Sequence, residues 1–144
     1  MTESRAVAER ALCGLVHGLA QQIADHVRDR AVTLGLTAPQ ATALRELTGP
    51  MTMRELAERM SCEPSNATFV VDKLEKQGLL ERRAHPTDRR ARHLVLTGDG
   101  QALRERLLAL LNEESPLAGL SPAEQQVLQG LLEQALVPGA GRRG

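Results

Sequence analysis

The segment from Met53 to Gly100 restricts the possible folds more than any other part of the chain. It begins with two short amphipathic stretches separated by a turn, and Pro64 stands where the first residue of a helix tolerates proline. Two short β-type runs follow at about 80–83 and 93–96, with an arginine-rich turn between them. A helix pair followed by a small basic hairpin is typical of a winged helix-turn-helix, in which one helix enters a DNA groove.

Further helices are predicted on both sides of this segment. Apolar residues recur in steps of three and four over about 4–34, and a capping box at Thr37 opens a second helix. Two leucine-rich helices follow Gly100. The expected fold is therefore mainly α with a small two- to three-stranded β wing. The expected organisation is an N-terminal dimerisation helix at 1–35, a winged helix-turn-helix lobe at 36–100, C-terminal dimerisation helices at 101–137 and a disordered tail at 138–144.

Leucines on the first and the last helices form stripes that are wider than one small lobe can cover. We therefore expect these stripes to join two copies of the chain in a homodimer. The alternative is that they pack within a single chain. The predicted interface residues are Leu12, Leu15, Leu19, Leu128, Leu131 and Leu132.

Positive charge is concentrated in one short segment, although the chain carries 18 basic and 18 acidic residues. Residues 81–97 hold five arginines against one glutamate and one aspartate, which suits a local phosphate-binding surface. Asp88 is expected to pair with Arg90 and to hold the turn in shape. The predicted wing contacts to double-stranded DNA are Arg83, His85, Asp88, Arg89, Arg90 and Arg92. The predicted contacts from the outer face of the preceding helix are Ser65, Asn66, Thr68, Phe69 and Lys73.

Residues 36–136 resemble the MarR family of bacterial transcription regulators, and the N-terminal helix extends the resemblance to nearly the whole chain. The resemblance implies a homodimer whose recognition helices, at 64–77, enter successive major grooves of a pseudo-palindromic operator. It also implies repression of a neighbouring gene, relieved by a small ligand or an oxidant. The residues that carry it are Leu56-Ala57-Glu58, Pro64-Ser65-Asn66-Ala67-Thr68, Val71-Asp72-Lys73-Leu74-Glu75, Gly78-Leu79-Leu80-Glu81-Arg82-Arg83 and Asp88-Arg89-Arg90, with Leu96-Thr97 and Gly100.

Two residues depart from the family's pattern. Glu63 stands where a serine N-cap is common, and Phe69 stands where many members have arginine or glycine. Both departures leave the base preference open. Since acidic residues outnumber lysines over 61–77, affinity for DNA is expected to depend mainly on the wing arginines and to fall steeply with salt.

The resemblance also implies a pocket for a small anionic or phenolic effector beside the DNA lobe. Arg10, His17, Arg28 and Arg45 are candidates to meet an anion there, and plain surface exposure is the alternative for each. Cys13 and Cys62 are candidates for a redox response, and packing as small apolar residues is the alternative for both. No metal site and no cofactor are expected, because no pair of histidines has the spacing of a tight metal site.

Enzymatic function is not expected, because the chain has no glycine-rich phosphate loop, nucleophile elbow or metal motif. The serious alternative to a DNA-binding regulator is a winged-helix module that binds a protein partner and has weak or no affinity for DNA. No apolar run is long enough to cross a bilayer, and the first residues lack a secretion signal. A cytoplasmic protein without a membrane partner is therefore expected. Whether it represses or activates depends on the position of its operator.

Overall fold

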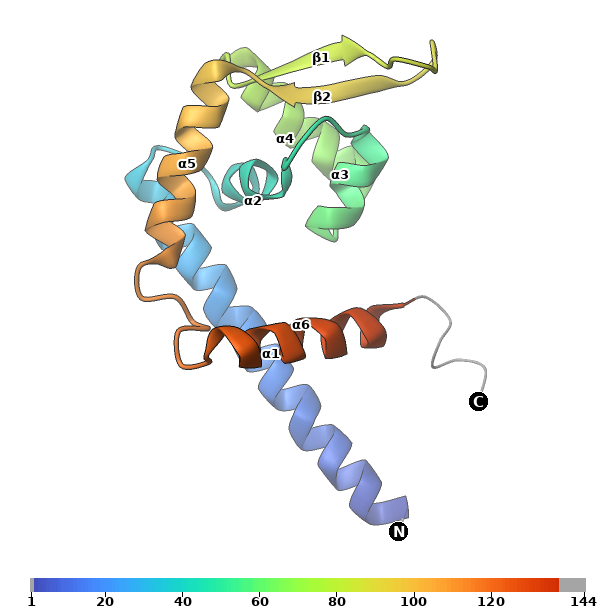
Figure 1. The fold of residues 1–144 in the computed structure, drawn as a ribbon, viewed down its shortest axis with the longest axis vertical. Helices are drawn as coiled ribbons and strands as arrows, with labels where there is room; N and C mark the ends of the chain where they lie inside the picture. The colour runs from blue at the N-terminus through green and yellow to red at the C-terminus, as the bar shows by residue number, and fades with distance from the viewer. Residues whose placement is uncertain (1, 138–144) are drawn as a thin grey trace. The chain divides into compact units, whose positions relative to one another are not determined.

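The structure is a computed structural model that describes residues 2–137 and contains six helices and one two-stranded sheet within that range (Figure 1). The predicted tail at 138–144 lies outside the described residues. In chain order the elements are α1 (Thr2–Thr33), α2 (Ala38–Glu46), α3 (Met53–Met60), α4 (Pro64–Lys76), β1 (Leu80–Ala84), β2 (Arg92–Leu96), α5 (Gly98–Asn112) and α6 (Pro122–Leu136).

The chain forms two compact units, one that ends at Glu113 and one that begins at Glu114. The first unit holds α1 to α5 with the hairpin, and the second holds α6. The structure thus places the N-terminal helix and α5 in the same unit as the predicted DNA lobe. The boundary predicted at 35 falls between α1 and α2 of that unit, and the boundary predicted at 100 falls within α5.

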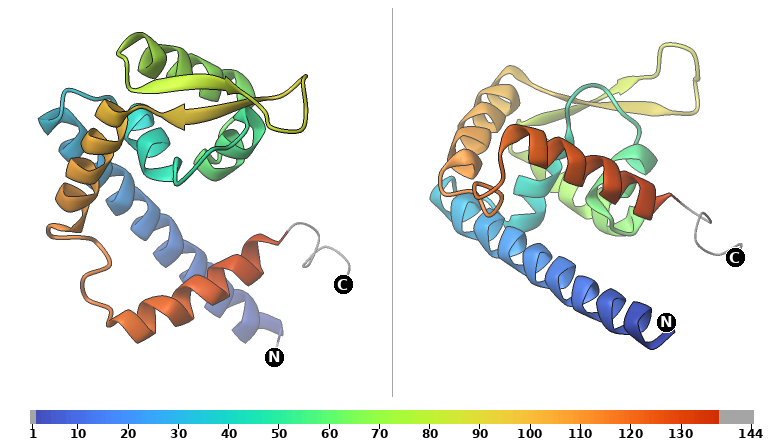
Figure 2. Two further views of the ribbon diagram at one scale, coloured as in Figure 1. Left: turned by 45° about the horizontal axis from the view of Figure 1, so that its top comes forward. Right: turned by 60° about the horizontal axis from the view of Figure 1, so that its bottom comes forward.

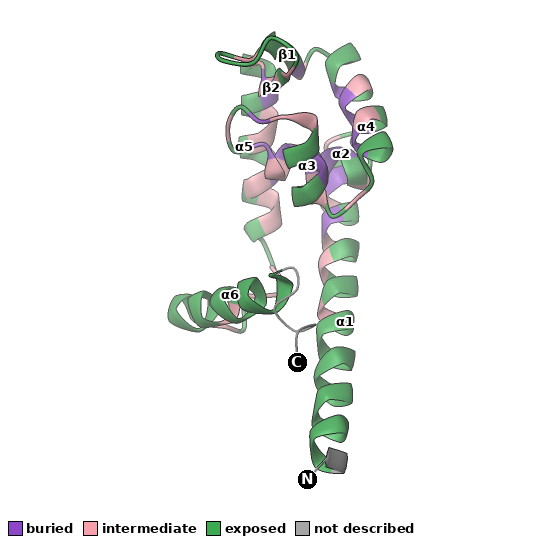
Figure 3. Ribbon diagram, turned by 90° about the vertical axis from the view of Figure 1, so that its right-hand side faces the viewer, coloured by how far each residue is buried: buried purple, intermediate pink, exposed green. Residues whose placement is uncertain are grey.

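The core of the first unit is built from leucine, valine, alanine and methionine. Val27 and Ala31 bring the C-terminal end of α1 into it, and from residue 4 onward only this end of α1 contains buried residues (Figure 3). Each fully buried leucine stabilises the fold by roughly 1.5–3 kcal/mol relative to an exposed one. The largest fully buried side chains are Leu44, Leu47, Met51, Leu56, Val71, Leu74, Leu80, Leu94 and Leu107.

Three capping boxes open α2, α3 and α6. In each, the hydroxyl of the N-cap residue accepts the backbone N–H of the third helical residue, whose side chain accepts the N-cap N–H. The N-cap residues are Thr37, Thr52 and Ser121, of which Thr37 confirms the capping box predicted above. A cap of this kind stabilises a helix by about 1 kcal/mol, so the helix starts are encoded locally.

The wing is an antiparallel hairpin whose register runs from Leu80 opposite Leu96 to Ala84 opposite Arg92. Its turn extends beyond the helices of the first unit in both further views (Figure 2). Met51 adds one isolated bridge to Leu94, with backbone N···O distances of 3.3 and 2.7 Å. The sheet itself therefore has two strands, at the lower end of the predicted number.

The helix predicted to follow Gly100 begins earlier, at Gly98. The hydroxyl of Thr97 accepts the backbone N–H of Gly100 at 3.0 Å and so caps this helix. Gly100 lies in its first turn, where an added Cβ would stand 2.0 Å from the carbonyl oxygen of Leu79. The glycine that resembles a chain break in the sequence is therefore a close-packing position inside α5.

No described helix combines the length and the apolar character needed to cross a membrane.

Candidate nucleic-acid interface

The outer face of α4 carries the polar residues predicted to meet DNA. Ser65, Asn66, Phe69 and Lys73 are exposed, and Thr68 is half-buried, with its hydroxyl donating to the carbonyl of Pro64 at 2.9 Å. The inner face packs in the core through Ala67, Val70, Val71 and Leu74, all of them buried. The packing of the inner face therefore fixes which side of α4 faces solvent. This is the side that the sequence analysis predicted to be exposed.

The turn before α4 is tight. Ser61 adopts a left-handed conformation with a φ of 54°, and Cys62 donates its backbone N–H to the carbonyl of Ala57 at 3.0 Å. Ala57 is buried, which lets α3 and α4 approach each other closely. Glu63 is the N-cap of α4 and makes no side-chain cap hydrogen bond, so it contributes negative charge beside the positive end of the helix dipole.

Phe69 and Lys73 form a pair on the outer face of α4. The Lys73 ammonium lies 4.5 Å from the centre of the Phe69 ring, a cation–π contact one helical turn along. Phe69 remains 62% exposed although it is the only aromatic residue of the chain. The contact of Phe69 with DNA remains a prediction; a thymine methyl group is the part of a base that an exposed ring can meet.

The wing arginines divide into two groups. The guanidinium of Arg83 pairs with the carboxylate of Glu81 at 3.0 Å. The side chains of Arg89, Arg90 and Arg92 are exposed and form no ion pair with any residue that the structure describes. Three positive charges at the end of the hairpin are therefore available to phosphate groups.

Two side chains hold the wing turn in shape. Nδ1 of His85 accepts the backbone N–H groups of Thr87 and Asp88 at 3.1 and 3.0 Å. The carboxylate of Asp88 accepts the backbone N–H of Arg90 at 2.9 Å. Asp88 thus pairs with Arg90 as expected, but through the main chain rather than the guanidinium. Both side chains therefore stabilise the turn. Their predicted contacts with DNA remain predictions.

Sequence reasoning missed a link between the wing and α4. Arg82 on β1 hydrogen-bonds the carboxylate of Asp72 and lies 3.9 Å from that of Glu75, both on α4. Arg82 is half-buried, so the pair is partly shielded from solvent. The alternation of charges in the sequence does not disclose it, because a strand and a helix must first pack against each other.

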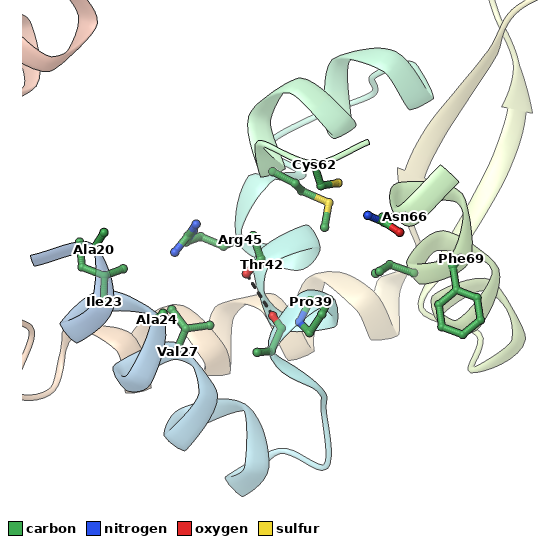
Figure 4. Close-up of a pocket in the computed structure, with 13 residues that line it drawn as sticks. Ala20, Ile23, Ala24, Val27, Pro39, Thr42, Arg45, Cys62, Asn66 and Phe69 are labelled. Carbon is green, nitrogen blue, oxygen red and sulfur yellow. Dashed lines mark hydrogen bonds between the residues drawn. The ribbon is translucent and has the colours of Figure 1, made fainter. Parts of the chain in front are cut away.

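A cavity of about 540 Å³ lies between α1, α2 and the helix-turn-helix, a size that suits a small molecule (Figure 4). Of the four candidate effector residues only Arg45 lines it. Arg10, His17 and Arg28 lie elsewhere on α1 and are exposed, and Arg28 pairs with Asp25 at 3.1 Å. The lining residues are Ala20, Ile23, Ala24, Val27, Ala38, Pro39, Thr42, Arg45, Met60, Cys62, Asn66, Phe69 and Val70.

The two cysteines occupy different surroundings. Cys13 is exposed on α1, and Cys62 is half-buried at the cavity wall. Both are free thiols. The described residues contain no group of three or more His, Cys, Asp or Glu side chains placed to hold a metal ion.

Apolar side chains of α1 and α6 remain exposed. Leu12 and Leu15 are 59% and 72% exposed on α1, and Leu131 is 59% exposed on α6. Leu19 and Leu128 are half-buried, and Leu132 is 37% exposed. A run of exposed leucines on one helix is typical of a surface that another chain covers.

The other end of α1 is fixed by polar contacts to α5. Nε2 of His26 lies 2.8 Å from the carbonyl oxygen of Leu111, and Arg30 donates to the carbonyls of Leu110 and Glu113 at 3.2 and 2.9 Å. These bonds satisfy the carbonyls that end α5. They tie the first helix to the fifth within one chain.

Two carboxylates of the capping boxes titrate below the usual range of glutamate. The backbone N–H of Thr52, followed by its hydroxyl, donates to the carboxylate of Glu55 and lowers its pKa. The backbone N–H and hydroxyl of Ser121 lower the pKa of Glu124 in the same way. Both carboxylates are exposed, so they act on helix starts rather than in a buried site.

Known proteins resemble this chain both in sequence and in fold. The MarR family model matches residues 36–91. The chain is similar to the uncharacterised HTH-type transcriptional regulator YkoM of Bacillus subtilis, 34% identical over 60% of this chain and 58% of that one. The match thus spans less than two thirds of that relative.

The chain is also 32% identical to the HTH-type transcriptional repressor Rv2887 of Mycobacterium tuberculosis over 70% and 76% of the two chains. A mutant MarR from E. coli, solved in complex with operator DNA, superimposes with a TM-score of 0.69 at 26% identity, covering 88% and 94%.

Proposed function

Because the chain belongs to the MarR family, we propose that it is a transcription regulator of the bacterial cytoplasm that binds double-stranded DNA as a homodimer and represses a nearby gene. In this proposal α4 is the recognition helix and enters the major groove. The hairpin is the wing and holds the flanking backbone. The E. coli relative supports the proposal, since it is solved on operator DNA and shares the fold.

One observation carries the proposal: the guanidinium groups of Arg89, Arg90 and Arg92 are exposed and unpaired among the described residues. Arg82 and Arg83, one strand earlier, are both paired with carboxylates. Three exposed arginines without an acidic partner in the described chain form a local positive surface beside the turn. Phosphate groups of DNA are a ligand for such a surface.

The homodimer is proposed from the exposed leucines of α1 and α6. Two copies would cover them and bring two recognition helices onto one duplex. Such an arrangement reads an operator whose two halves are related by symmetry. The predicted interface residues on both helices fit this role.

A small-molecule effector that releases the DNA is proposed from the cavity. Its wall includes Asn66 and Phe69 of the recognition helix, so a bound molecule touches the part of the protein that reads the bases. Oxidation of Cys13 or Cys62 is the second candidate signal. Cys62 supports this second signal, because it lines the same cavity and lies in the turn that directly precedes α4.

The competing proposal is a protein-binding module with weak or no affinity for DNA. Glu63 and the exposed ring of Phe69 favour it, because negative charge and an apolar surface suit a protein partner better than phosphate. The three unpaired arginines weigh against it.

The test is fluorescence anisotropy of the purified protein on the duplex upstream of its own gene, beside a scrambled duplex, at two salt concentrations. Tight, selective and salt-sensitive binding supports the regulator. A parallel series with peroxide separates a redox signal from a ligand signal. Absence of selective binding both here and on a randomised DNA pool would favour the protein-partner proposal.

A further inference from the structure

Resting on the proposed function, we propose that the cavity binds a neutral, largely apolar small molecule that carries one hydrogen-bonding group, and that Glu46 makes the cavity discriminate against anions. The discrimination arises from one ion pair at the cavity wall. The signalling arises from one amide that the cavity shares with the DNA-reading face.

Arg45 is the only charged side chain among the residues that line the cavity. Its Nε donates to the carboxylate of Glu46 at 3.2 Å, and both side chains are half-buried, with exposed fractions of 33% and 27%. The positive charge that an anion needs is therefore already offset by a neighbouring negative charge. Binding a carboxylate would place two negative charges around a single guanidinium.

Two more guanidinium groups lie near the same end of α2, and both are engaged with main-chain carbonyls. Arg104 donates to the carbonyls of Leu44 and Arg45 at 2.8 and 3.0 Å. Arg59 donates to the carbonyl of Glu46 at 3.3 Å. Neither arginine lines the cavity, so both stabilise the C-terminal end of α2 and add no positive charge to the cavity wall.

The remaining wall is mostly apolar and offers few hydrogen-bonding groups. The hydroxyl of Thr42 already donates to the carbonyl of Ala38 at 3.0 Å. The amide of Asn66 extends from α4 toward the cavity and makes no hydrogen bond with the rest of the described chain (Figure 4). A ligand with one polar group can therefore bury its apolar body against α1 and α2 and bond to Asn66.

Asn66 also lies on the exposed face that the proposed function assigns to base reading. An amide that bonds to the ligand is withdrawn from the bases, so ligand and DNA compete for the same side chain. This coupling is reciprocal: operator DNA should weaken ligand binding by the same factor as the ligand weakens DNA binding.

The experiment compares two probes of one shape, 1-naphthamide and 1-naphthoate, by their own fluorescence. The chain contains no tryptophan and no tyrosine, so the protein adds almost no background. We expect naphthamide to bind the wild-type protein about tenfold more tightly than naphthoate. Glu46→Gln should raise the affinity for naphthoate about fivefold and leave naphthamide within about twofold.

Three further variants keep the result interpretable. Glu105→Gln makes the same change of charge on an exposed site of α5 outside the cavity and should alter neither affinity. Arg45→Gln should weaken naphthoate further and spare naphthamide, which checks the ion pair from its other side. Asn66→Ala should weaken naphthamide about fivefold. Circular dichroism confirms that each variant folds.

Equal affinity for the two probes, binding of neither probe, or an unchanged preference in Glu46→Gln would each overturn the inference. Anisotropy on operator DNA, measured on the same preparations, distinguishes this failure from failure of the proposed function. Selective DNA binding without the ligand preference leaves the regulator standing. Loss of selective DNA binding in the wild-type protein contradicts the regulator, whatever the probes do.

Discussion

The guanidinium of Arg82 on β1 hydrogen-bonds the carboxylate of Asp72 on α4, so the wing and the recognition helix are joined by an ion pair. Glu75, one turn further along α4, lies 3.9 Å from the same guanidinium. Arg82 therefore makes its contacts within the protein, and it holds together the two elements that are proposed to touch DNA.

Breaking this pair should reduce DNA affinity although neither residue is proposed to touch DNA. Arg82→Ala leaves Asp72 and Glu75 as unpaired carboxylates near the duplex and should weaken binding by about 1–2 kcal/mol. Asp72→Asn should have a smaller effect because the amide still accepts a hydrogen bond. A double-mutant cycle on DNA affinity measures the coupling. Strictly additive losses would show that the pair does not act as a unit.

Arg90→Ala should weaken binding to specific and random duplexes alike, because a phosphate contact carries no base information. The slope of log affinity against log salt should fall by about one. Arg83→Ala is the matched control, since the guanidinium of Arg83 is already paired with Glu81 and should affect the slope less. Equal slopes for wild type and Arg90→Ala would remove this arginine from the interface.

Gly100→Ala should destabilise the fold by about 3 kcal/mol, because the new Cβ would meet backbone rather than a movable side chain. Its closest neighbours would be the carbonyl oxygen of Leu79 at 2.0 Å and Cδ2 of Leu96 at 3.3 Å. Gly98→Ala is the control in the same helix, where nothing lies within 4 Å, and it should leave stability unchanged or slightly raised. Urea denaturation followed by circular dichroism compares the two. Similar midpoints would mean that the close approach is relieved at little cost.

Leu131→Asp should yield monomers with poor affinity for DNA, because a carboxylate at an interface of leucines would be buried without a partner. Sedimentation equilibrium gives the mass, and anisotropy gives the affinity. Gln126→Asp adds the same charge on another side of α6 and should leave the dimer intact. If Leu131→Asp still dimerises, the interface lies elsewhere.

Acid should weaken the start of α3 through Glu55. The pKa of this carboxyl is lowered in the folded protein by the N–H and the hydroxyl of Thr52. The capping contribution is therefore complete above the unfolded pKa, near 4.5, and is lost as the pH falls through the lower folded value. Glu55→Gln does not titrate, so the stability difference between it and the wild type should shrink over that acid range. A difference that stays constant down to the acid limit would show that the carboxylate charge does not matter.

Much of the fold follows from local sequence signals. The three capping boxes and the left-handed glycines at 35 and 78, with φ of 72° and 74°, mark helix ends that neighbouring residues decide by themselves. The start of α5 was predicted too late, because glycines at 98 and 100 resemble a break. The role of Gly100 depends on how closely Leu79 approaches it, and only the packed structure shows this contact.

The candidate site was harder to predict than the fold. The outer face of α4 followed from helical periodicity, since Ala67 and Val71 must point inward. The predicted wing contacts included Arg83, whose guanidinium is paired with Glu81, together with the unpaired arginines at 89, 90 and 92, and its contact with DNA remains a prediction. Sequence reasoning also proposed Arg10, His17 and Arg28 for the cavity, whereas the cavity is lined by the α1 residues from Ala20 to Val27. Charge pairing and cavity position both depend on contacts between elements distant in sequence.

The 32-residue helix α1 has consequences for mechanical coupling. Its C-terminal end is anchored in the core by Val27 and Ala31 and tied to α5 by His26 and Arg30, while Leu12 and Leu15 stand free about 20 Å away at 1.5 Å per residue. The helix is thus a rigid lever whose pivot adjoins the cavity. A tilt of about 6° at the pivot displaces the far leucines by about 2 Å, as much as the helix shifts of about 1–2 Å that occur at subunit interfaces. In a dimer joined through those leucines, a molecule too small to span the lobe would still alter the distance between the two copies of α4.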